Sequence, residues 1–184
     1  MPTVQSRLID KNIGYIHIFS FAKHTDEEFD KQLASIKAQG ADRLIIDLRM
    51  NPGGLVDTVI SIMNQILTKG RVLSYHTRNG DDRTFDITGI ETPLPMVILI
   101  DRNSASASEI LAGAVQDKKE GIIIELKAIN IDNLKLDSEK IHEKLLSECE
   151  VALNQIEEKE YTSILKNTGI DNILKIGIAF FGKE

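Results

Sequence analysis

Two hydrophobic periods alternate along the first two thirds of the chain. Short apolar runs rich in β-branched residues, each typical of a strand in a parallel sheet, occupy residues 13–21, 42–49, 93–101 and 121–129. Stretches with apolar residues at helical spacing occupy residues 25–40, 55–70 and 108–117. Thr25 is the expected N-cap of the first helix. The repeated strand–helix order predicts parallel strands connected by helices.

This order predicts an α/β protein, a three-layer sandwich in which helices cover both faces of a mainly parallel sheet of about five or six strands. A peripheral hairpin is expected over residues 71–89, where Asn79 and Gly80 suit a tight turn. The tail predicts a long amphipathic helix over 138–159, a short helix over 161–167 and a last strand over 173–181. The 184 residues are expected to form one compact domain.

Composition narrows the function classes without identifying one. The net charge of −6 lacks the basic excess of a non-specific nucleic-acid binder, so no nucleic-acid partner is expected. The sequence has neither a long apolar run nor a basic, leucine-rich leader, which predicts a soluble, cytoplasmic chain without membrane contact. The single cysteine, Cys149, excludes an intramolecular disulfide, and no Cys/His spacing suits zinc. The oligomeric state is left open.

Candidate chemistry centres on residues 101–110, which read DRNSASASEI. A serine between a buried strand and a helix projects its hydroxyl beyond the sheet edge, where the N–H groups of the helix N-terminus also point. The loop at 47–54, DLRMNPGG, follows the neighbouring strand and offers glycine N–H groups at the same edge. A simpler interpretation is that Ser104 and Ser108 cap the helix and that the glycines only turn the chain.

Three segments resemble, in order, the catalytic core of the C-terminal processing peptidases, also called tail-specific proteases: GYIHIFSF, LIIDLRMNPGGLVDTV and VILIDRNSASASEILAGAVQD. The resemblance covers about residues 7–117. It implies a serine-type endopeptidase that acts on polypeptides near their C-termini, with Ser106 as the nucleophile. It also implies an oxyanion hole made by the backbone N–H groups of Ala107 and of the pair Gly53 and Gly54. Met50 stands where this family usually has asparagine.

The same resemblance points to a missing general base. In this family a buried lysine accepts the serine proton, because burial disfavours the charged ammonium form. Alignment through the helix at 108–117 places Ile131 where that lysine belongs. Lys127 is an alternative base, although a solvated strand lysine is the simpler interpretation. The four histidines form no Ser/His/Asp arrangement by spacing, so the sequence predicts absent or very weak turnover.

The tail, residues 118–184, resembles the end of PD-(D/E)XK nuclease-like proteins. That resemblance implies that Glu125 and Lys127 hold Mg²⁺ or Mn²⁺ and orient a water, with Gln155 and Tyr161 in support. The second carboxylate that such a metal needs has no firm counterpart. Alternating charge at a strand end explains the Glu125 and Lys127 pair without any metal.

The two resemblances predict a chimera in which a peptidase-like segment, 1–117, joins near residues 116–120 to a nuclease-like segment, 118–184, that completes the sheet. The chimera could be a natural recombinant or an engineered fusion. Three functions remain open: a weak or inactive serine peptidase that uses no cofactor, a remnant of a metal-dependent nuclease, and a non-catalytic scaffold. The more complete motif set around Ser106 favours the peptidase, whose partner would be a polypeptide substrate.

Overall fold

The computed structural model describes residues 2–77 and 80–126, together with residues 143, 146, 147 and 150. Residue contacts divide the chain into two compact units, 1–126 and 127–184, and the candidate site lies in the first. The helices predicted over 138–159 and 161–167 and the strand predicted over 173–181 lie outside the described residues, except for the four single positions just named.

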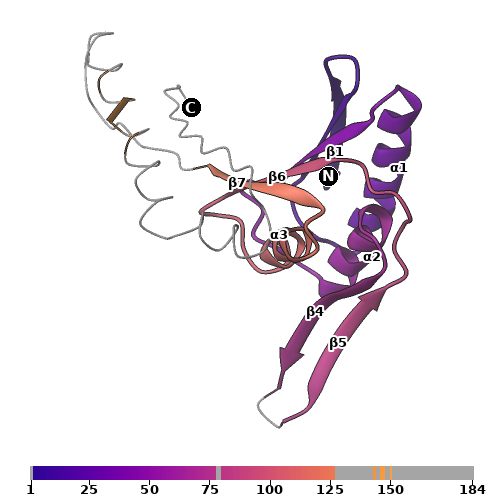
Figure 1. The fold of residues 1–184 in the computed structure, drawn as a ribbon, viewed down its shortest axis with the longest axis vertical. Helices are drawn as coiled ribbons and strands as arrows, with labels where there is room; N and C mark the ends of the chain where they lie inside the picture. Colours follow the sequence, from indigo (N-terminus) through magenta and orange to yellow (C-terminus); the bar gives the residue numbers. More distant parts are fainter. Residues whose placement is uncertain (1, 78–79, 127–142, 144–145, 148–149, 151–184) are drawn as a thin grey trace. The chain divides into compact units, whose positions relative to one another are not determined.

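A five-stranded sheet with the order β1-β2-β3-β6-β7 forms the centre of the first unit (Figure 1). Its strands are β1 (Val4–Ile9), β2 (Ile13–Ile18), β3 (Arg43–Asp47), β6 (Met96–Asp101) and β7 (Gly121–Leu126). The strands from β2 to β7 pair in parallel, and β1 pairs antiparallel with β2. The predicted α/β class with a mainly parallel sheet is confirmed. The first strand, β1, was not predicted.

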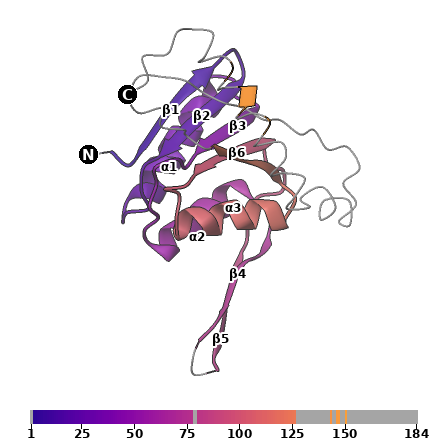
Figure 2. The same cartoon turned by 90° about the vertical axis from the view of Figure 1, so that its left-hand side faces the viewer.

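Three helices link these strands: α1 (Thr25–Ala38), α2 (Val56–Ile66) and α3 (Ala107–Asp117). Figure 2 shows them on one side of the sheet, with α2 between α1 and α3. They form the helical layer that the sequence predicts on that face. The prediction of Thr25 as the N-cap of α1 is wrong, because His24 occupies that position. Thr25 is buried instead, and its hydroxyl accepts a hydrogen bond from Ala22 N–H at 2.9 Å.

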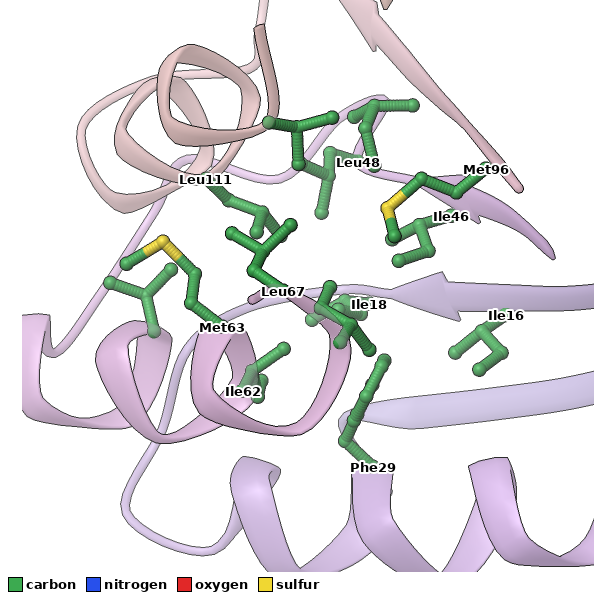
Figure 3. Close-up of a cluster of buried hydrophobic side chains, with 14 of the residues drawn as sticks. Ile16, Ile18, Phe29, Ile46, Leu48, Ile62, Met63, Leu67, Met96 and Leu111 are labelled. Atoms are coloured by element: carbon green, nitrogen blue, oxygen red, sulfur yellow. The ribbon is translucent and has the colours of Figure 1, made fainter. Parts of the chain in front are cut away.

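The main core lies between the sheet and these helices (Figure 3). Side chains alternate along a strand, so each strand sends every second residue towards the helices. The strands contribute the buried residues Ile16, Ile18, Leu44, Ile46, Met96 and Ile98. Phe29 from α1, Ile62 and Met63 from α2 and Leu111 from α3 fill the space opposite, each 0 % exposed. Burying each such side chain contributes about 1.5–3 kcal/mol, which fixes the strand ends that carry the candidate site.

The predicted peripheral hairpin is confirmed. Strands β4 (Gly70–His76) and β5 (Asp82–Ile87) pair antiparallel in a separate two-stranded sheet that projects from the body of the unit (Figure 2). Tyr75 and Phe85 stack across this ribbon with ring centroids 6.2 Å apart. Asn79 of the expected turn lies outside the described residues.

The first unit extends past the junction predicted at residues 116–120. Strand β7 pairs with β6 along its whole length, and its first residue, Gly121, is closely packed. A Cβ atom on Gly121 would lie 2.7 Å from Met96 Cγ and 2.7 Å from Val115 Cγ1. The Glu120 carboxylate accepts a hydrogen bond from Thr68 N–H at 2.9 Å and binds the Thr68 hydroxyl with its other oxygen. The strand after residue 120 is therefore part of the same core as the strands before it.

We expect Gly121→Ala to destabilise the first unit by roughly 1–3 kcal/mol, because the new methyl group must displace packed side chains of β6 and α3. Gly113→Ala is the matched control. It lies in α3 with nothing within 4 Å of an added Cβ, so it should stabilise the helix by about 1 kcal/mol. Urea unfolding of both variants checks this pair, and an unchanged midpoint for Gly121→Ala would show that β7 is not packed on this core.

Candidate active site

The candidate site lies where two neighbouring parallel strands end. Strand β3 leads through residues 48–55 into α2, and β6 leads through residues 102–106 into α3. Because β3 and β6 pair in parallel, their carboxyl ends lie at the same edge of the sheet. Hydrogen bonds join the two loops directly: Ala105 N–H donates to Asn51 O at 3.2 Å, and Met50 N–H donates to Asp101 Oδ1 at 3.0 Å.

Ser104 and Ser108 hold the loops together. The Ser104 hydroxyl donates to Leu48 O at 2.8 Å, and the Ser108 hydroxyl, which is fully buried, donates to Asn51 O at 3.0 Å. The interpretation of these two serines as caps of α3 is wrong, since Ser106 is the N-cap. Each hydroxyl instead satisfies a carbonyl of the loop that follows β3.

Ser106 has a strained backbone. Its φ of 55° and ψ of −113° place it in a region that residues with a side chain rarely adopt. Its N–H donates to Glu109 Oε2 at 2.6 Å, so the carboxylate of the first helical turn holds the bend. This is the geometry of a sharp strand-to-helix turn that presents a serine at the sheet edge. Ser106 is exposed, whereas Ala107 after it is 0 % exposed.

The structure brings Gly53, Ser106 and Ala107 together, as the sequence predicts. A Cβ atom on Gly53 would lie 2.8 Å from Ser106 Cβ and 3.0 Å from Ala107 N. Gly53 has a φ of 102°, which favours glycine for a second reason. Gly54 follows with a φ of 145° and is exposed. The backbone of the loop after β3 therefore lies directly against Ser106 and Ala107.

Asn51 is a site residue that the sequence interpretation missed. It is 0 % exposed, its amide nitrogen donates to Ile18 O at 2.8 Å, and its amide oxygen accepts from Gly53 N–H at 2.8 Å. An asparagine directly before Pro-Gly-Gly was the available signal, because short polar side chains in such loops often bond the backbone two residues on.

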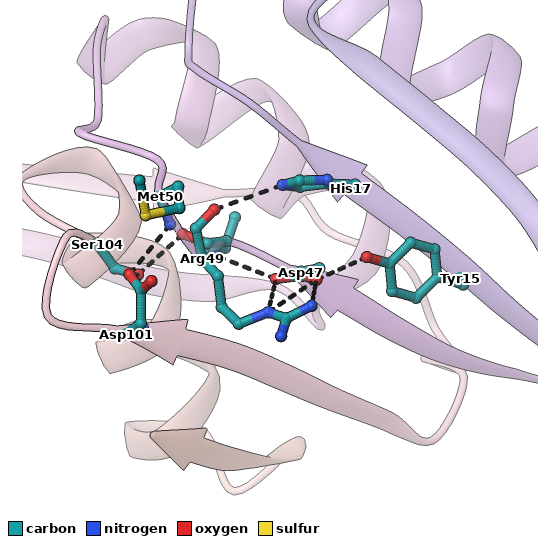
Figure 4. Close-up of polar contacts among 8 residues, drawn as sticks. Tyr15, His17, Asp47, Arg49, Met50, Asp101 and Ser104 are labelled. Atoms are coloured by element: carbon teal, nitrogen blue, oxygen red, sulfur yellow. Dashed lines mark hydrogen bonds and ion pairs between the residues drawn. The ribbon is translucent and has the colours of Figure 1, made fainter. Parts of the chain in front are cut away.

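A second polar cluster, made by Tyr15, Asp47 and Arg49, lies at the ends of β2 and β3 (Figure 4). Asp47 is fully buried and accepts hydrogen bonds from the Tyr15 hydroxyl at 2.6 Å and from Arg49 Nε at 2.9 Å. Burial raises the pKa of Asp47, but the hydrogen bonds from Arg49 and Tyr15 outweigh it and leave that pKa below its usual value. Burial and the Asp47 carboxylate both raise the pKa of Tyr15.

Met50 occupies a position that suits asparagine better. Its φ of 61° lies in the left-handed region, where the short polar side chain of asparagine is tolerated and methionine is not favoured. The side chain is 68 % exposed, and Asn103 Nδ2 lies 2.9 Å from its sulfur. The departure from the family residue therefore has a conformational cost.

Among the described residues, no histidine contacts the Ser106 hydroxyl in a way that would let it take the proton. His17 Nε2 lies 3.4 Å from Arg49 O, and His76 pairs with Asp82. Lys118 donates to Lys69 O at 3.1 Å, near the opposite end of α3. Ile131 and Lys127, the expected and alternative positions of the base, lie outside the described residues.

The nuclease-like set is only partly described. Glu125 is exposed on β7, and Lys127, Gln155 and Tyr161 lie outside the described residues. Within residues 2–77 and 80–126, no group of three or more His, Cys, Asp or Glu side chains is arranged to hold a metal ion. Over that same part of the chain, no helix combines the length and apolar character needed to cross a bilayer.

Comparison with known proteins assigns the family. The sequence profile of peptidase family S41 matches residues 12–128. The chain belongs to peptidase family S41. This match runs past the junction predicted at 116–120 and ends close to the boundary between the two units.

Curated processing proteases match about 60 % of this chain or more. A carboxyl-terminal-processing protease of Picosynechococcus is 37 % identical over 125 residues, which cover 66 % of this chain and 30 % of the relative. The carboxy-terminal processing protease CtpB of Bacillus subtilis is 39 % identical over 108 residues, covering 58 % of this chain and 22 % of that protein. The chain thus spans less than a third of these relatives.

Among solved structures, the photosystem II D1 C-terminal processing protease superposes with a TM-score of 0.57 at 26 % identity. The match covers 66 % of this chain and 35 % of that structure. This similarity supports the α/β fold with a mainly parallel sheet.

Replacing the strained serine by glycine should stabilise the S41 core. A side chain at this φ and ψ costs about 1–3 kcal/mol, and glycine removes that cost while adding about 0.5–1 kcal/mol of backbone entropy loss. We expect Ser106→Gly to be about 1–2 kcal/mol more stable than the matched variant Ser106→Ala, which keeps the Cβ atom. Equal unfolding free energies in urea would contradict the strained conformation.

The Asp47 cluster predicts a pH dependence of stability. Because the folded-state pKa of Asp47 is lowered, its stabilisation is present above the unfolded-state pKa of about 4 and is lost as the pH falls through the folded-state value. We expect Asp47→Asn to be roughly 1–3 kcal/mol less stable at neutral pH, with the difference shrinking as the pH falls below the unfolded-state pKa. Urea unfolding across pH checks this, with exposed Asp30→Asn as the control. A difference that stays constant with pH would contradict it.

Proposed function

We propose that the chain carries the nucleophile and oxyanion half of a Ser–Lys peptidase site for polypeptide substrates, and that its turnover is absent or very weak. The observation that carries the proposal is the meeting of Gly53, Ser106 and Ala107 at the joined ends of β3 and β6. The cleavage of polypeptides near their C-termini is carried over from the names of the S41 relatives. The weak turnover follows from Ile131 at the position of the family's lysine.

The chemistry would begin with attack of Ser106 Oγ on the carbonyl carbon of a peptide bond. The oxygen of that carbonyl takes up negative charge and accepts hydrogen bonds from Ala107 N–H and from the Gly53–Gly54 segment. The proton on Oγ must pass to a base as the new C–O bond forms, and the leaving amine must regain a proton when the C–N bond breaks. Without the lysine, the chain's own groups supply the hydrogen bonds to the oxyanion but neither of these two proton transfers.

The base can be tested through its effect on covalent labelling of Ser106. A fluorophosphonate forms an Oγ–P bond, fluoride leaves, and the hydroxyl proton passes to hydroxide when no side chain takes it. We expect the labelling rate to rise about tenfold per pH unit from about pH 7 to about pH 10, because the alkoxide fraction follows the hydroxide concentration. A serine served by a neutral lysine would instead reach a plateau. Mass spectrometry should find the label on Ser106 and not on Ser104.

Turnover is tested with fluorogenic peptides on the full chain and on Ser106→Ala. We expect rates within about tenfold of each other, because general-base catalysis supplies about 10²–10⁴-fold and is missing. Robust cleavage that Ser106→Ala abolishes would contradict the missing base. If the fluorophosphonate labels Ser106 no faster than Ser104, that result would contradict the peptidase geometry. If the chain cuts DNA with Mg²⁺ and Glu125→Ala loses this activity, the result would favour a nuclease instead.

A further inference from the structure

Asn51 is fully buried. Its carboxamide lies between the end of β2 and its own loop, residues 48–55, called here the glycine loop. Its backbone carbonyl faces the serine loop, residues 102–106. The two ends of the carboxamide face groups of opposite character, since Ile18 O can only accept a hydrogen bond and Gly53 N–H can only donate one. The orientation of the amide is therefore fixed: Nδ2 donates to Ile18 O at 2.8 Å, and Oδ1 accepts from Gly53 N–H at 2.8 Å. The N–H of Gly53 therefore already has a hydrogen-bond acceptor within the protein.

The adjacent glycine keeps its N–H available. Phe21 forms a parallel bridge with Gly54, in which Phe21 N–H donates to Gly53 O at 2.9 Å and Leu55 N–H donates to Phe21 O at 2.7 Å. In such a bridge the N–H of the middle residue, Gly54, points away from the partner strand. Phe21 lies on the β2 side of the loop, so Gly54 N–H faces the β6 side, where the serine loop lies. Gly53 is buried, whereas Gly54 is exposed.

The backbone of Asn51 binds the serine loop as well. Its carbonyl accepts hydrogen bonds from Ala105 N–H at 3.2 Å and from the Ser108 hydroxyl at 3.0 Å. One residue thus fixes the glycine loop through its side chain and the serine loop through its carbonyl. The separation between the Gly54 N–H and Ser106 depends on both sets of contacts.

We propose that Asn51 is a positioning residue that keeps Gly53 N–H bonded within the protein and presents Gly54 N–H, with Ala107 N–H, as the donor pair for the developing oxyanion. This inference deepens the proposed function and rests on it for the oxyanion role. It makes Gly54, and not Gly53, the glycine that touches the substrate. Asn51 acts through that glycine and contacts no reacting atom.

Amide hydrogen exchange on the ¹⁵N-labelled full chain tests the hydrogen-bond assignment without any substrate. In the unmodified chain we expect Gly53 N–H to exchange at least about tenfold more slowly than Gly54 N–H, because only the former is bonded and buried. In Asn51→Ala the Gly53 N–H should lose that protection, while Ile46 in β3 keeps its own. Thr58→Ala is the matched control, since it removes another buried polar side chain, one that donates to Ala22 O at 3.2 Å.

A peptide boronic acid tests the oxyanion role. Ser106 Oγ bonds to boron, the hydroxyl proton passes to buffer, and boron becomes a four-coordinate anion with no leaving group. We expect the Gly54 and Ala107 amide resonances to shift on binding and the Gly53 resonance to move little. Affinity in Asn51→Ala should fall by about 10- to 100-fold, the scale of a misplaced donor, while Thr58→Ala binds as the unmodified chain does.

The outcomes separate the two proposals. Gly53 N–H exchanging as fast as Gly54 N–H in the unmodified chain would overturn the role of Asn51 even if the boronic acid binds. A Gly53 resonance that shifts more than that of Gly54 would overturn the choice of donor. Failure of the boronic acid to bind the unmodified chain would overturn the peptidase proposal, and the exchange rates would still decide whether Asn51 holds Gly53.

Discussion

Asn51, which is fully buried, joins three chain segments at the edge of the sheet where β3 and β6 end. It joins the end of β2 to the glycine loop, and its backbone carbonyl joins that loop to the serine turn before α3. Leaving a buried donor or acceptor unpaired costs roughly 1–3 kcal/mol, a large share of the stability of a domain of this size. The arrangement of the site therefore has the same physical origin as the stability of the sheet edge on which it lies.

The strain at Ser106 is sustained by the same packing. Ala107 is buried, Gly53 leaves no room for a side chain beside the serine, and Glu109 holds the Ser106 N–H. Strained residues persist only where their surroundings over-determine them, and they concentrate at functional sites. The part of the site that we propose to bind developing negative charge is thus built into the core. The proposed proton transfer would need a lysine where the family resemblance places Ile131.

The sequence predicted the parallel strands because their apolar runs are continuous. The resemblance to the family motifs predicted that Ser106, Ala107, Gly53 and Gly54 lie at one edge of the sheet. Strand β1 was not predicted, because its alternation of polar and apolar residues is short and gives a weak signal. The sequence could not show how Gly121 fits against Met96 and Val115, because that packing depends on tertiary contacts of β7 with β6 and α3. Asn51 was missed because its role depends on carbonyls and N–H groups that only tertiary contacts bring near it.

A crystal structure of the chain with a peptide boronic acid bound to Ser106 tests the role of Asn51 most directly. We expect a boronate oxygen roughly 2.7–3.1 Å from both Gly54 N and Ala107 N, with Gly53 N–H still bonded to Asn51 Oδ1. A boronate oxygen bonded to Gly53 N, with the Asn51 side chain turned away, would contradict it.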